Sequence, residues 1–251
     1  MTYIPHRDFF VEVQKGNVAG HAMVHKFGRN AAVANGSFEH ISLLSAATTF
    51  LTAATTVRVK AGNAADDTAG AGAQEITVVG IDDNLAEVTE EIATAGASAS
   101  SNSAASFWRV YRAYVSAAGT YGSANTAAVT IENSAGTVDL IQIAIEEGQS
   151  QFAGYTVPTG KTAYWLGAHI MVDANKAADV KFIQRRTFND TSAPVESVRL
   201  INYWDGVQGN MSFQPRSPGV FPALTDLWFE AQGSGAATEV SVDFELLIVD
   251  D

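Results

Sequence analysis

A strict alternation of polar and apolar side chains near the C-terminus is the feature that most constrains the fold. In residues 239–246, which read EVSVDFEL, polar residues alternate with Val240, Val242, Phe244 and Leu246. A period of two places alternate side chains on opposite faces of a β-strand. The run therefore predicts a strand with one face in a core and the other towards solvent.

Further short runs of the same kind are spread along the chain and are rich in β-branched and aromatic residues. They predict strands at 75–82, 88–92, 107–115, 129–132, 140–145, 163–172, 180–184, 198–203 and 226–231. Clusters of Gly, Ser, Asn and Asp between them mark turns, and no stretch of 12 residues has a clean helical period. The sequence thus predicts an all-β protein with an antiparallel β-sandwich or jelly-roll-like fold.

The composition shifts give a three-part division. Residues 1–56 form an N-terminal arm or attachment segment, residues 57–135 a first β domain, and residues 136–251 a second, jelly-roll-like β domain. The boundary near 133–137 has another reading, as a hairpin turn inside one larger sandwich.

The charge balance limits the partners that the chain can have. Lys and Arg number 15 against 27 Asp and Glu, a net charge of −12. Such an acidic surface repels phosphate, so no nucleic-acid partner is expected. The first ten residues hold charges and Pro5, and the uncharged run at 41–57 is short for a transmembrane helix. No membrane partner is therefore expected.

The N-terminal segment differs in charge from the rest. Residues 1–60 hold six basic and three acidic residues, and four of the five histidines lie among them. Aromatic anchors beside a cation suit a buried contact with a guanidinium at its rim. We therefore predict an arm that contacts another protein through Arg7, Phe9, Phe10, Phe27 and Arg29. In the alternative interpretation, the segment supplies the first strands of an ordinary sandwich.

Two motifs imitate known sites without meeting their requirements. His21 and His25 have the spacing of two zinc ligands on a helix, but a zinc protease needs Glu where Ala22 stands. Residues 160–162 read Gly-Lys-Thr, yet the first glycine of a P-loop is out of register and a strand-like run follows. We predict no metal site and no cofactor.

Paired carboxylates and aromatic residues are the remaining candidates for chemistry. Pairs such as Asp66–Asp67 and Asp82–Asp83 have the residue type of a glycosidase, but solvated turns explain them more simply. Aromatic residues in strands form a core or a subunit interface more often than a sugar platform. A Ser-His-Asp triad has no motif to support it. We therefore predict no catalytic residues and no enzymatic activity.

Five segments, taken in order, resemble a family of virion structural proteins from marine tailed bacteriophages, of the podovirus-like type that infects cyanobacteria and other ocean bacteria. They are residues 6–30, 55–96, 107–120, 148–166 and 240–251. The resemblance implies a β-sandwich component of a virus particle with no enzymatic role. It carries over no individual site residue.

The resulting hypothesis is a capsid-surface protein, such as a decoration or cement protein, that stabilises the particle. The alternatives are a tail component (tube, nozzle or fibre base), a host-glycan-binding spike module, and a glycan-degrading enzyme. The expected partners are other virion proteins and further copies of the chain, with a trimer favoured. The expected location is the virion, assembled in the host bacterial cytoplasm.

Overall fold

The protein is almost entirely β-structure. The computed structural model describes residues 7–122, 124–235 and 237–251. Within them lie sixteen strands, one short helix α1 (Phe9–Gln14) and one 3-10 turn η1 (Ser45–Ala47), and the paired strands all run antiparallel. The all-β, antiparallel fold class predicted from the alternation is confirmed.

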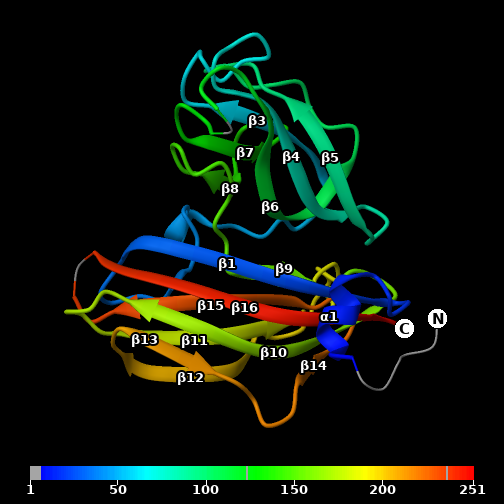
Figure 1. Cartoon of the computed structure of the whole chain (residues 1–251), viewed down its shortest axis with the longest axis vertical. Coiled ribbons are helices and arrows are strands. Elements are labelled where there is room, and N and C mark those ends of the chain that lie inside the picture. Colours follow the sequence, from blue (N-terminus) through cyan, green and yellow to red (C-terminus); the bar gives the residue numbers. More distant parts are fainter. Residues whose placement is uncertain (1–6, 123, 236) are drawn as a thin grey trace.

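Two sheets face each other to form a sandwich (Figure 1). The first sheet has the order β1-β16-β10, and β13 and β14 both pair with β10. Its strands are β1 (His21–Val33), β16 (Thr238–Asp250), β10 (Lys161–Val172), β13 (Asn210–Phe213) and β14 (Gly219–Phe221). The second sheet has the order β12-β11-β15, and β2 and β9 both pair with β15. Its strands are β12 (Arg199–Val207), β11 (Ala178–Arg185), β15 (Asp226–Gly233), β2 (Glu39–His40) and β9 (Gly154–Thr156).

The sandwich core is aromatic. Phe182, Phe229 and Phe244 are fully buried, and the Phe182 and Phe229 rings stack with their centroids 4.5 Å apart. Trp165 and Trp204 extend this cluster from the two facing sheets. The apolar residues of the EVSVDFEL run point into it, because the predicted alternation of β16 holds.

A second β domain interrupts the sandwich between β2 and β9. It comprises residues 55–148, which we call the inserted domain, and its sheet has the order β5-β4-β6-β3-β7-β8. Its strands are β3 (Thr55–Ala61), β4 (Ala73–Asp82), β5 (Glu87–Ala93), β6 (Ser106–Ala118), β7 (Val129–Asn133) and β8 (Asp139–Ile143). In Figure 1 it stands above the sandwich, next to β1 and β9.

The observed division of the chain differs from the predicted boundaries. Residues 21–33 do not form part of a separate arm, because β1 pairs with β16 from His21↔Val249 to Val33↔Thr238. The expected boundary at 135/136 falls in the turn between β7 and β8, which pair as a hairpin. The prediction of an arm rests on the charge of the N-terminal segment. Local charge contains no information about the pairing of β1 with β16, which lies at the other end of the sequence.

A buried ion pair fixes the inserted domain to the sandwich. Arg109 of β6 donates two hydrogen bonds to Asp226 of β15, at 3.0 and 2.9 Å, and both side chains are almost completely buried. Arg185 and Thr156 also donate to Asp226, at 3.0 and 2.8 Å. The Arg109 guanidinium lies 4.5 Å from the ring centre of Phe188. The Asp226 carboxylate thus accepts four hydrogen bonds, and the two from Arg109 cross the junction between the domains.

A second buried group lies nearby at the same junction. Lys26 of β1 is enclosed, and its Nζ donates to the backbone oxygen of Tyr111 in β6. The Tyr111 hydroxyl donates to Glu87, and its ring centre lies 5.0 Å from that of Tyr155 in β9. Burial lowers the pKa of Lys26 to about 7, with a further decrease from nearby Arg112 and an opposing effect of Glu87.

Candidate functional site

The motifs considered for metal and nucleotide binding lie in strand and turn structure. His21 and His25 both belong to the strand β1, so their spacing of four residues does not place them on one face of a helix. Lys161 begins β10 and its Nζ donates to Asp250 at 2.6 Å. Among residues 7–122, 124–235 and 237–251, no group of three or more His, Asp and Glu side chains could hold a metal ion.

One acidic pair is more than a solvated turn. Asp82 accepts hydrogen bonds from the backbone N–H groups of Asn84 and Ala86 in the turn between β4 and β5, as expected. Asp66, in contrast, is fully buried, and it accepts from three backbone N–H groups at 2.8 to 3.0 Å. The Asp66 carboxylate therefore joins two loops of the inserted domain, which is a structural role.

The predicted interaction residues do not form one patch. Arg7, Phe9 and Phe10 lie at α1: Arg7 pairs with Glu12 at 3.3 Å, and the Phe9 ring contacts those of Phe10 and His21. Phe10 has 44% of its surface exposed.

The other two predicted residues lie farther along β1. Phe27 is half-buried, opposite Asp243 of β16. Arg29 donates to Glu239 at 2.7 Å and pairs with Glu147 of the inserted domain at 3.5 Å. The Arg29 guanidinium therefore already serves contacts within the chain, and the predicted interaction through these five residues stays a prediction.

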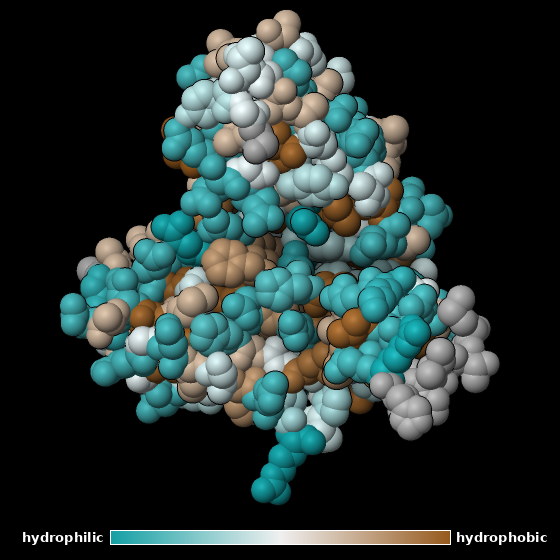
Figure 2. All heavy atoms as spheres, in the orientation of Figure 1, coloured by the Kyte–Doolittle hydropathy of each residue, from teal (hydrophilic) through white to brown (hydrophobic). Residues whose placement is uncertain are grey.

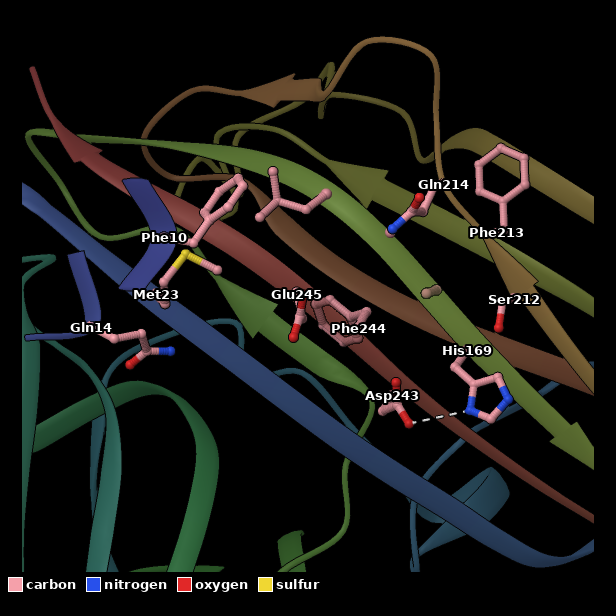
Figure 3. Close-up of a pocket in the computed structure, with 13 residues that line it drawn as sticks. Phe10, Gln14, Met23, His169, Ser212, Phe213, Gln214, Asp243, Phe244 and Glu245 are labelled. Atoms are coloured by element: carbon pink, nitrogen blue, oxygen red, sulfur yellow. Dashed lines mark ion pairs between the residues drawn. The ribbon is translucent and has the colours of Figure 1, made fainter. Parts of the chain in front are cut away.

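A groove of about 690 Å³ crosses the outer face of the first sheet (Figure 3). Phe10 and Met23 lie towards one end of it, and His169 and Ser212 towards the other. His169 Nδ1 is 3.6 Å from a carboxylate oxygen of Asp243.

The groove contains the closest approach to a catalytic arrangement. Ser212, His169 and Asp243 are register neighbours on β13, β10 and β16. A triad needs the serine hydroxyl hydrogen-bonded to the imidazole and the imidazole to the carboxylate. No Ser212–His169 hydrogen bond is formed, and the His169–Asp243 distance exceeds hydrogen-bonding range. These three side chains are close to one another because their residues are register neighbours on adjacent strands, and no catalytic role is needed to explain their proximity.

The side of the sandwich away from the inserted domain is uncovered. We call residues 195–220 the bare edge. It contains β12, β13 and β14. Among the described residues, β12 pairs with β11 alone, and β13 and β14 pair with β10 alone. In Figure 1 these strands lie at the lower side of the molecule.

Exposed apolar side chains are concentrated on this bare edge. Of nine large apolar residues that are exposed in the described part of the chain, five belong to it: Val195, Val198, Leu200, Tyr203 and Val220. Leu200 has 55% of its surface exposed. On the face drawn in Figure 2, apolar spheres also lie in small groups over the sandwich and near its junction with the inserted domain. Exposed apolar clusters on a folded protein mark surfaces that contact other proteins.

Sequence reasoning predicted part of this edge as a strand but did not single it out as a surface. Residues 198–203 were expected to be a strand, and β12 contains most of them. The sequence does not indicate whether this strand lies at the edge or in the middle of its sheet. An apolar residue in a strand is as compatible with a buried core position as with an exposed edge. The strand order, which no local pattern contains, places Leu200 on an edge strand.

Comparisons with known proteins add little to this picture. No protein-family model matches the chain, and no curated protein matches it. In the described part of the chain, no helix is both long enough and apolar enough to cross a membrane.

Solved structures that align with the chain include those of infectious bursal disease virus. One is that of T=1 particles derived from the virus, with 9% identity over 92% of this chain and 74% of that chain, and a TM-score of 0.21. Another is that of the virus of the Gx strain, with 11% identity over 96% and 82% and the same TM-score. A TM-score this low carries no argument about fold or function.

Proposed function

We propose that the protein is a structural component of a virus particle, most simply a capsid-surface protein that acts through protein–protein contacts. One observation carries the proposal: a body of two β domains, joined by a buried ion pair, leaves one apolar edge unpaired within the described residues. Exposed apolar strand edges are prone to pair with other chains, so a surface of this kind favours assembly with partners. The resemblance of the sequence to tailed-phage virion proteins supports the same conclusion.

The location in the particle is tested by counting copies. Quantitative mass spectrometry of purified particles of a tailed phage that encodes this protein gives its copy number relative to the major capsid protein. We expect a high count, comparable to that of capsid subunits, because a surface protein follows the symmetry of the shell. A small ring-sized count would place the protein in the tail, and its absence from particles would contradict a virion role.

We also propose that the protein has no catalytic activity. The groove residues Ser212, His169 and Asp243 are the ones to challenge, since they are nearest to a hydrolytic arrangement. We expect purified protein to show no turnover of ester, peptide or glycan substrates above buffer, and Ser212→Ala to be indistinguishable from it. Turnover that Ser212→Ala or His169→Ala removes, while leaving the unfolding midpoint unchanged, would overturn this proposal.

A further inference from the structure

The bare edge offers hydrogen bonding as well as apolar contact. β12 is nine residues long and pairs on one side only, so the backbone groups on its other side are unpaired within the described chain. Proteins usually protect such edges with charge, bulges or cover. Here the outer positions include Leu200 and Tyr203, beside the basic residue Arg199. These features favour pairing with another strand whose charge is opposite.

The inserted domain carries a strand of that description. β5 reads EVTEEIA and pairs only with β4, so it is also an edge. Glu87 and Glu91 are exposed on it, and Asp83 precedes it in an exposed turn. The inserted domain as a whole holds twelve acidic and four basic residues, a net charge of −8. Two β5 strands would repel each other, because like charges across a strand pair are destabilising.

The bare edge lies in a more basic environment. Residues 178–220, which hold β11, β12 and the bare edge, include five basic and four acidic residues, in a chain with a net charge of −12. Arg216 is exposed and makes no ion pair within the described residues. Arg199, the first residue of β12, is exposed as well, and its partner Glu196 lies three residues earlier in the preceding loop.

We infer that the bare edge of one copy docks on the β5 edge of the inserted domain of a second copy. The inference rests on the proposed structural function, which it makes specific. The inserted domain stands on the opposite side of the sandwich from β12 in Figure 1, so one copy cannot satisfy both surfaces itself. The contact is heterologous, and repetition of it closes a ring or continues as a row.

Reciprocal charge reversal tests this contact. The edge variant is Arg199→Glu with Arg216→Glu, and the insert variant is Asp83→Arg with Glu91→Arg. All four residues are exposed, so both variants should keep the unfolding midpoint of the parent chain. Lys15→Glu, just after α1 and outside both strands, serves as a control for negative charge added away from the contact.

Sedimentation velocity at low salt is the measurement. We expect the parent chain and Lys15→Glu to self-associate, and each reversed variant to associate at least about tenfold more weakly. An equimolar mixture of the two variants restores both contacts, as does one chain that combines all four substitutions. Added salt should weaken the parent assembly, because the charges lie at the rim.

Two results would overturn the inference: a parent chain that stays monomeric at high concentration, or reversed variants that associate as the parent does. Failure of the mixture to reassemble would do the same. These outcomes are separate from the proposed function, because incorporation into particles is counted independently. A protein present in particles but monomeric in solution would leave the virion role intact and remove this contact.

Discussion

Replacing Asp226 by asparagine is expected to lower the free energy of unfolding by about 3–5 kcal/mol, because it leaves buried cations without their counter-charge. Arg109 is 3% exposed and directs two hydrogen bonds at the Asp226 carboxylate. Asparagine has nearly the same shape, so the loss reports charge and hydrogen bonding and not a cavity. Urea unfolding followed by fluorescence and circular dichroism gives the change directly.

Asp250→Asn is the matched control for this experiment. Asp250 pairs with Lys161 at 2.6 Å, but both side chains are substantially exposed. A surface pair contributes about 1 kcal/mol or less. A cost for Asp226→Asn as small as that of Asp250→Asn would show that the Arg109–Asp226 pair does not hold the two domains together.

Replacing Lys26 by methionine is expected to stabilise the protein at neutral pH and to flatten its pH dependence. Burial lowers the pKa of Lys26 from 10.5 to about 7. Between pH 7 and pH 10 the unfolded chain therefore keeps a proton that the folded chain has lost. Stability then rises with pH across this window, by up to about 4 kcal/mol from this one group. Below pH 7 both states are protonated and the folded state carries the full cost of a buried charge.

Methionine keeps the length of the lysine stem and removes the ionisable group. Denaturant unfolding at several pH values between 6 and 10 should show a rising free energy for the parent and a nearly flat one for Lys26→Met. Lys60 is exposed on β3, so Lys60→Met should leave the slope as it is in the parent. A parent chain whose stability falls between pH 7 and pH 10 would contradict the burial of Lys26 at the junction.

The sequence predicts strands where one face of a strand meets a core and the other meets water. Residues 239–246 satisfy that condition, and β16 follows the predicted alternation. The strand β1 breaks the pattern, because its buried positions include Lys26, Gly28 and Asn30. Polar residues at buried positions leave β1 without the apolar period that predicts a strand.

Strand pairing over long sequence separations is a second feature that sequence analysis does not predict. Arg109 and Asp226 are 117 residues apart, and neither has a local signal that marks it as a partner of the other. The same holds for the bare edge, whose exposure follows from the strand order. Local propensity specifies which segments are strands, whereas the sheet order depends on contacts that no short window contains.

The order in which these sheets can assemble follows from where the inserted domain lies in the chain. All six of its strands fall within residues 55–143, so a ribosome releases a complete set of partners before the sandwich has half of its own. β1, made first, must wait for β16, made last. During synthesis the earliest strand is thus held without its neighbour while the domain behind it folds. The polar side chains of Lys26 and Asn30 keep that waiting strand less prone to pair with the wrong edge.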